Sequence, residues 1–181
     1  MNTAIYAPTE KMSLSRIHDL VRTPILGEIL IEVLSSPFDG MDTVQGDPAS
    51  LPQEVRDLYG RPVIESGNRK APLAMMRMVP HSPDHPSTEP MGKLVNFVRG
   101  LDVPTEIVWG MNDPITGRAL PAMIDHFPDA RVTETEAGHF LQEEVPDVIA
   151  AAVMRVYDSI HAEPAPVEDT AAAPVVENEE N

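Results

Sequence analysis

Two residues in the second half of the chain have the types and spacing for acid–base chemistry. Asp113 follows the β-prone run "TEIVWG", and His139 follows a second β-prone run, "ARVTETEAG". A carboxylate that accepts a hydrogen bond from imidazole Nδ1 leaves Nε2 free to take a proton. His139 is therefore a candidate general base and Asp113 its orienting acid. The alternative interpretation is an aspartate in a turn and a histidine at the end of a strand.

This chemistry requires two neighbouring strands that end at the same edge of a sheet. The two β-prone runs predict strands, residues 116–127 predict a helix between them, and Pro146 opens a last helix. Strand, helix, strand, helix is the order of a parallel α/β unit, whose ligands bind at the carboxyl ends of the strands. Apolar residues at helical spacing predict the buried face of the last helix: Ile149, Ala150, Val153, Met154, Val156 and Tyr157.

The first hundred residues are predicted to be mainly helical and irregular. Residues 1–7 are apolar and stopped by Pro8, which indicates the end of a strand. A helix should follow Thr23-Pro24, and another should run from about Ser50 to Gly60. Further short helices are expected around residues 74–78 and 93–99. Four prolines in "PHSPDHPSTEP" predict an irregular loop between them.

Composition excludes several functional classes. The 181 residues carry a net charge of −16, and the six acids of residues 162–181 leave −10 on the remainder, which argues against nucleic acid or anionic membranes as partners. That C-terminal segment has few apolar residues and is expected to be disordered. The chain contains no cysteine, which excludes disulfides and thiol catalysis. No signal peptide and no membrane-spanning run is recognisable, so a cytoplasmic location is expected.

Three segments resemble a known family. "VPTEIVWGMNDPITG", "FPDARVTETEAGHFLQEEVPDVIA" and "RMVPHSPDHPSTEP" are similar to the C-terminal part of α/β-hydrolases, especially the haloalkane dehalogenase group. The resemblance implies an α/β chain with a partial α/β-hydrolase fold. Residues 1–7 would end a core strand, residues 8–100 would form a helical cap with its return loop, and residues 101–161 would form the C-terminal core.

The same resemblance assigns the triad acid to Asp113 and the triad histidine to His139. Some relatives carry the acid after the preceding strand, but that position is Ala4 here. A nucleophile elbow, which the family requires, is not recognisable at Gly40-Met41-Asp42, Ser66-Gly67 or Gly100-Leu101-Asp102. The chain therefore resembles the second half of a hydrolase, completed by a missing N-terminal half or by another chain. Alone, it should expose an apolar sheet flank and be molten or aggregation-prone.

The implied reaction is hydrolysis of a small apolar substrate without metal or organic cofactor. Ester or epoxide hydrolysis is an alternative to dehalogenation, and a catalytically inactive fragment or interaction partner is an alternative to an enzyme. Trp109 is expected in the core rather than at a halide site. A substrate pocket could be lined by Met75, Met76, Met78 and Phe140.

Two other acid and histidine clusters have simpler interpretations. His81, Asp84 and His85 share a proline-rich loop that excludes the helix needed for metal-ligand spacing, so a solvated loop is expected. Glu143 and Glu144 lie near His139 and compete with Asp113 as its partner, although acids at a helix start usually just favour its dipole.

Overall fold

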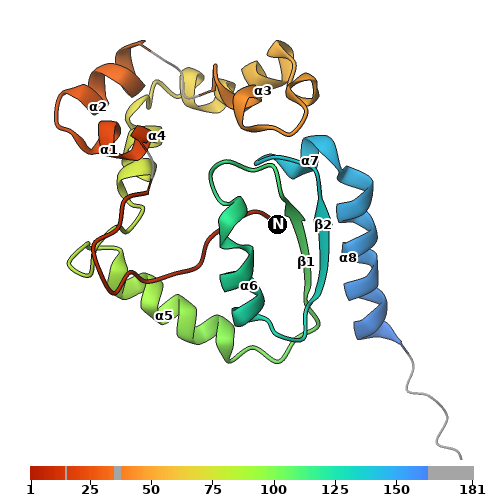
Figure 1. Cartoon of the computed structure of the whole chain (residues 1–181). Helices are drawn as coiled ribbons and strands as arrows, with labels where there is room; N and C mark the ends of the chain where they lie inside the picture. Colours follow the sequence, from red (N-terminus) through yellow and green to blue (C-terminus); the bar gives the residue numbers. More distant parts are fainter. Residues whose placement is uncertain (15, 35–37, 163–181) are drawn as a thin grey trace, which may run out of the picture.

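The structure is a computed structural model that describes residues 1–14, 16–34 and 38–162 (Figure 1). Helices dominate this part of the chain and surround one two-stranded sheet. Within the same residues, no helix is both long and apolar enough to cross a bilayer. The predicted disordered tail lies, from residue 163 onward, outside the described residues.

The sheet confirms the predicted parallel pairing. β1 (Glu106–Gly110) and β2 (Arg131–Thr135) run parallel, with Glu106 opposite Arg131 and Gly110 opposite Thr135. The connection between them contains a 3-10 turn, η4 (Gly117–Ala119), and helix α6 (Leu120–His126). After β2 follow the short α7 (Leu141–Glu144) and the long α8 (Pro146–His161).

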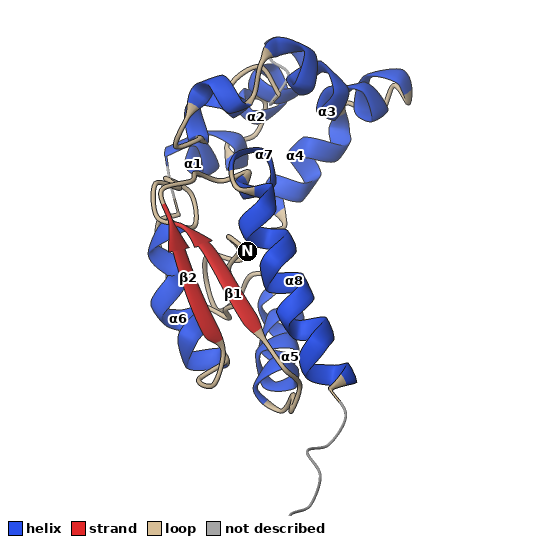
Figure 2. Cartoon of the chain, turned by 90° about the vertical axis from the view of Figure 1, so that its right-hand side faces the viewer, coloured by secondary structure: helices blue, strands red, loops and turns tan. Residues whose placement is uncertain are grey.

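A helix covers each face of the sheet (Figure 2). Side chains of a strand alternate between the faces, so Ile107 and Trp109 pack toward α6 while Val108 packs toward α8. Trp109 is only 1% exposed, and its indole N–H donates to the Gly117 carbonyl at 3.0 Å. This tryptophan is a core residue, as predicted, and its only polar atom is already engaged.

The predicted buried face of α8 is largely wrong. Ala152 is the buried residue of this helix, whereas Val153, Met154 and Tyr157 are 61%, 54% and 53% exposed. The reason is the width of the sheet. A two-stranded sheet covers only a narrow strip of α8, so apolar residues at helical spacing continue beyond the strands.

The first hundred residues form a series of short helices with a small core of their own, built on Val21, Ile31 and Leu73. The helices are α1 (Arg16–Arg22), α2 (Leu26–Glu28), the π-helical turn η1 (Ile29–Leu34), the 3-10 turns η2 (Met41–Val44) and η3 (Pro48–Ser50), α3 (Gln53–Glu65), α4 (Lys70–Arg77) and α5 (Thr88–Arg99).

Two predicted helix boundaries are wrong. α3 does not end at Gly60 but continues past Pro62 to Glu65. Gly60 is buried, and an added Cβ would lie 3.2 Å from the Phe38 ring, so this glycine serves close packing rather than termination. α5 starts at Thr88, so Pro90 lies in its first turn, where an amide hydrogen has no intrahelical acceptor.

Residues 1–7 form no strand, although the sequence indicates one. The segment nevertheless lies against β1, because the Asn2 side chain accepts from the Gly110 amide at 2.8 Å and donates to the Gly110 carbonyl at 2.9 Å. Further along, the Ile5 carbonyl contacts His126 Nε2 at 2.8 Å, and Arg99 Nε donates to Nδ1 of the same ring at 3.1 Å. These contacts fix the start of the chain to the sheet and to α6.

Candidate active site

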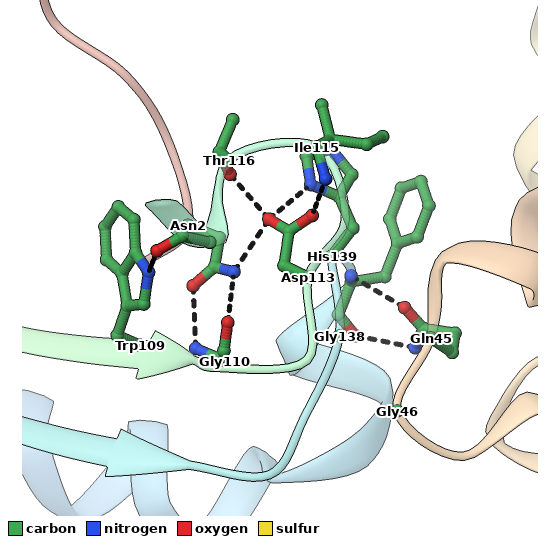
Figure 3. A network of polar contacts seen from close by, with 12 residues as sticks. Asn2, Gln45, Gly46, Trp109, Gly110, Asp113, Ile115, Thr116, Gly138 and His139 are labelled. Atoms are coloured by element: carbon green, nitrogen blue, oxygen red, sulfur yellow. Dashed lines mark hydrogen bonds and ion pairs between the residues drawn. The ribbon is translucent and has the colours of Figure 1, made fainter. Parts of the chain in front are cut away.

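Asp113 and His139 meet at the carboxyl ends of β1 and β2 (Figure 3). Asp113 lies in the turn after β1, and His139 follows β2 by four residues. His139 Nδ1 lies 3.0 Å from Asp113 Oδ2. Because an ionised carboxylate can only accept, Nδ1 carries the hydrogen of this contact, and in a neutral imidazole the lone pair is then on Nε2.

Three further donors saturate the Asp113 carboxylate. The Asn2 amide donates to Oδ2 at 2.7 Å, the Thr116 hydroxyl donates to Oδ2 at 2.5 Å, and the Ile115 backbone amide donates to Oδ1 at 2.7 Å. Burial of the carboxylate raises its pKa. The hydrogen bonds from His139, Thr116, Asn2 and Ile115 outweigh that effect and hold the pKa of Asp113 well below its usual range. The acid therefore stays ionised at neutral pH.

Asn2 is a site residue that sequence reasoning missed. It connects the end of β1 to the acid, since it binds both Gly110 and Asp113 through one side chain. A single asparagine in an apolar N-terminal run carries no signal for a partner more than a hundred residues away.

The backbone around His139 is held by the last residue of η2 and by the loop that follows it. The His139 amide donates to the Val44 carbonyl at 2.8 Å. The buried Gln45 side chain accepts from the Phe140 amide at 2.8 Å and donates to the Phe140 carbonyl at 3.1 Å. Gln45 is a second residue that the sequence did not indicate. It positions the histidine from a part of the chain far away in sequence.

Glu144 also joins the loop after η2 to the segment before His139. Its carboxylate accepts from the backbone amides of Gly138 at 2.7 Å, Gly46 at 3.1 Å and Asp47 at 2.8 Å. Glu143 accepts instead from the Tyr59 hydroxyl, at 2.5 Å. Neither acid competes with Asp113 for the imidazole, so that alternative for His139 is excluded by the geometry.

Two glycines allow this close approach. A Cβ added to Gly138 would lie 2.3 Å from the Val44 carbonyl oxygen, and one added to Gly46 would lie 2.2 Å from the Glu136 carbonyl oxygen. Any larger residue would push the two loops apart. The close contact between Ala137-Gly138 and the loop at residue 46 therefore requires glycine at both positions.

The His139 ring is partly accessible and has an aromatic neighbour. Its side chain is 25% exposed, whereas that of Asp113 is fully buried. Phe140 makes an edge contact with the imidazole at a centroid distance of 5.1 Å, and the Tyr59 and Phe140 ring centroids are 5.8 Å apart. Of the predicted pocket residues, Phe140 is thus the one beside His139.

The predicted methionine pocket does not assemble around this site. Met76 packs against the small core built on Val21, Ile31 and Leu73, while Met75 and Met78 are 71% and 63% exposed. A concavity of about 500 Å³ does lie near the site, but its lining is mostly polar and includes Asn112, Glu136, Glu143 and Glu144.

The His81–His85 loop shows no metal geometry. His85 contacts the Arg77 carbonyl through Nε2 and accepts from the Ser87 amide through Nδ1, which occupies both ring nitrogens. Across the residues that the structure describes, no group of three or more His, Asp or Glu side chains is placed to hold a metal ion.

Sequence comparison adds a relationship to this geometry. No protein-family model matches the chain. Haloalkane dehalogenase 1 of Mycobacterium tuberculosis H37Rv is 31% identical over 97 residues, which are 52% of this chain and 32% of the relative. A haloalkane dehalogenase of Mycobacterium marinum is 28% identical over 102 residues, 55% of this chain and 34% of the relative. No solved structure shows significant similarity.

These matches support a relationship to α/β-hydrolases. The matched region spans about a third of the length of each curated relative. This sequence relationship is consistent with two features of the structure. One is the parallel strand–helix–strand unit, and the other is the Asp113–His139 pair at the carboxyl edge of its strands.

Proposed function

We propose that this chain supplies the acid and the general base of a hydrolase of the haloalkane dehalogenase-like type. The observation that carries the proposal is the 3.0 Å contact between His139 Nδ1 and a buried, saturated Asp113 carboxylate. The relatives named haloalkane dehalogenase support the hydrolase class. The substrate class we propose is a small apolar organic molecule, in keeping with the aromatic Phe140 beside the base.

The roles of the two residues follow from their hydrogen bonds. Asp113 stays ionised, fixes the imidazole in its Nδ1–H tautomer and stabilises the imidazolium that forms during the reaction. His139 Nε2 takes a proton from the water molecule that attacks the substrate or a covalent intermediate. The exposed part of the His139 side chain gives water and substrate access to the ring.

Displacement of halide from an alkyl carbon requires a carboxylate nucleophile as well as a base. We propose that this nucleophile comes from polypeptide outside these 181 residues, because no elbow motif is recognisable in the sequence. The chain by itself should therefore not release halide. A base with an orienting carboxylate can still promote attack of water on an activated ester, which offers a direct assay.

The test is hydrolysis of 4-nitrophenyl acetate and release of bromide from 1-bromobutane by the purified full chain. We expect ester hydrolysis that falls on the order of 10²-fold in His139→Ala, the usual contribution of a general base. His161→Ala is the matched control, because His161 is an exposed histidine on α8. No bromide should appear with any variant.

Two results would contradict the proposal. Equal ester hydrolysis by the wild type and His139→Ala would mean that the pair is inert, which would favour an inactive fragment or an interaction protein. Bromide release that depends on His139 would mean that the chain contains its own nucleophile, and the proposed division of the site would be wrong.

A further inference from the structure

His126, the last residue of α6, is a buried histidine whose two ring nitrogens are both hydrogen-bonded. Its exposed fraction is 7%. Arg99 Nε donates to its Nδ1 at 3.1 Å, and its Nε2 lies 2.8 Å from the Ile5 carbonyl oxygen. A guanidinium can only donate, so Nδ1 accepts, and Nε2 carries the hydrogen and donates to Ile5. In this arrangement the ring is neutral and is held as a single tautomer.

The two hydrogen bonds explain why a polar ring occupies this buried position. An apolar side chain would be sufficient for packing, whereas a buried polar group costs free energy unless it is hydrogen-bonded. Neutral imidazole offers one donor and one acceptor, and here each has a partner from a different part of the chain. Arg99 is the last residue of α5, and Ile5 belongs to segment 1–7. His126 thus joins α5, α6 and segment 1–7 through polar contacts.

Segment 1–7 has no regular secondary structure, so contacts with the rest of the protein determine its position. It passes α6 on its way from the sheet (Figure 1), and Ile5 packs against the core cluster that includes residues of this helix. Three residues before Ile5, the Asn2 side chain binds Gly110 and donates to the Asp113 carboxylate (Figure 3). Three residues span at most about 10 Å, so the position of Ile5 limits where Asn2 can lie.

We propose that His126 is a positioning residue for the Asp113–His139 pair and acts through segment 1–7. By holding the Ile5 carbonyl, it keeps Asn2 in hydrogen-bonding contact with Asp113, which in turn orients His139. The effect on hydrolysis rests on the proposed function, whereas the effect on the position of Asn2 does not.

The competing explanation is that Asn2 holds itself in place through its own three hydrogen bonds. Ordering the residues between Asn2 and Ile5 costs conformational entropy, and a fixed Ile5 reduces the part of this cost that the Asn2 contacts must offset. The two explanations differ in one result. Breaking the contact between His126 and Ile5 should loosen Asn2 only if His126 positions it.

Two substitutions separate the roles of the two ring nitrogens. In His126→Gln, the side-chain amide nitrogen can take the place of Nε2 and donate to the Ile5 carbonyl. In His126→Asn, the amide oxygen can take the place of Nδ1 and accept from Arg99, but the shorter side chain does not reach Ile5. Both variants lose the ring, so His126→Gln is the matched control for lost packing.

The readout is hydrogen exchange of the Gly110 amide, which donates to Asn2 Oδ1 at 2.8 Å. The Met111 amide donates to the Thr135 carbonyl at 2.9 Å and reports on the sheet itself. We expect His126→Asn to accelerate exchange at Gly110 roughly tenfold, as the loss of one buried hydrogen bond would produce, with exchange at Met111 unchanged. His126→Gln should match the wild type at both amides.

Three results of the exchange experiment would overturn the proposal. Equal Gly110 exchange in His126→Asn and the wild type would mean that Asn2 is held without His126. Equal acceleration in the two variants, or equal acceleration at Gly110 and Met111, would mean that the ring serves packing alone. The His126 tautomer gives a test that needs no variant. An NMR spectrum of the wild type at pH 9 should show the proton on Nε2, and a proton on Nδ1 would exclude the contact with Arg99.

Ester hydrolysis connects this role to the site. With 4-nitrophenyl acetate, His126→Asn should lower kcat severalfold and leave KM unchanged, because His126 acts through Asn2 and Asp113 and not on the substrate. His126→Gln should keep the wild-type rate. Hydrolysis that does not depend on His139 would contradict the proposed function and leave the exchange result intact. Hydrolysis that depends on His139 but is equal in the two His126 variants would contradict the positioning role alone.

Discussion

At Asp113, four donors converge on one buried carboxylate, and only one of them is the histidine it orients. The other three hold the acid in place and ionised before any substrate arrives. A carboxylate and histidine in a hydrolytic site require such preorganisation, because no hydrogen bond then has to be rearranged when the imidazole becomes charged. The contacts of Asp113 therefore favour a functional role for Asp113 and His139. The alternative interpretation is an aspartate in a turn and a histidine at the end of a strand.

The low pKa of Asp113 predicts a loss of stability in acid. A carboxyl whose pKa is lower in the folded than in the unfolded chain contributes stability above the unfolded pKa of about 3.9, and that stability is lost as pH falls through the folded pKa. Asp113→Asn should therefore lower the free energy of unfolding at pH 7 by on the order of 2 kcal/mol. The gap between wild type and variant should shrink as the pH falls below about 4.

Urea midpoints of the two proteins at pH 7 and pH 2.5 measure this gap. Asp125→Asn is the control, because Asp125 is exposed on α6. A gap that stays constant between the two pH values would show that the Asp113 carboxyl has an ordinary pKa in the folded chain.

The sequence indicated Asp113 and His139 because each follows a β-prone run, and parallel strands bring such positions together. Asn2 and Gln45 could not be predicted in the same way. Their partners, Gly110 and Phe140, are 108 and 95 residues away. The sequence around a polar residue in an irregular segment does not indicate such a distant contact. Local patterns specify elements, whereas contacts between distant loops depend on packing.

At the scale of elements, the end of η2 with its following loop and the loop after β2 are joined by several hydrogen bonds. Val44 and Gln45 hold the backbone of His139 and Phe140, and Glu144 binds amides of both loops. His139 is thus positioned by a segment of the helical region as well as by the sheet.

A matched pair of glycine substitutions tests this coupling. Gly46→Ala should separate the loops, because its Cβ would lie 2.2 Å from the Glu136 carbonyl oxygen. Gly40→Ala should be neutral, since its nearest neighbour would be 3.9 Å away. Hydrogen exchange of the His139 amide, which donates to Val44, should accelerate roughly 10- to 100-fold only in Gly46→Ala, for a cost of about 1–3 kcal/mol. Equal exchange in both variants would mean that the loops are not coupled.

The errors in the predicted elements have a common origin. The apolar residues of α8 indicated a buried face, yet Val153 and Tyr157 are exposed. The spacing of apolar residues shows which face a helix can bury, but it does not show whether another element covers that face. Gly60 was interpreted as a helix end, although it lies inside α3 against Phe38. In both cases a tertiary contact, absent or present, decides against the local pattern.

At the scale of the whole molecule, a two-stranded sheet carries too little apolar burial for a firmly packed core. We expect the chain to bind a hydrophobic dye and to melt broadly. Thermal melts followed by circular dichroism measure this, and a sharp cooperative melt of the monomer would contradict the expectation.

The most direct test of the Asp113–His139 pair is the tautomer of His139, read from a long-range proton–nitrogen NMR spectrum of the imidazole at pH 9, where a free imidazole is neutral. The 3.0 Å contact predicts a proton on Nδ1 and a bare Nε2, and Asp113→Asn should abolish this preference. A proton on Nε2, or a spectrum unchanged by the substitution, would show that Asp113 does not orient the ring and that His139 is not the base proposed here.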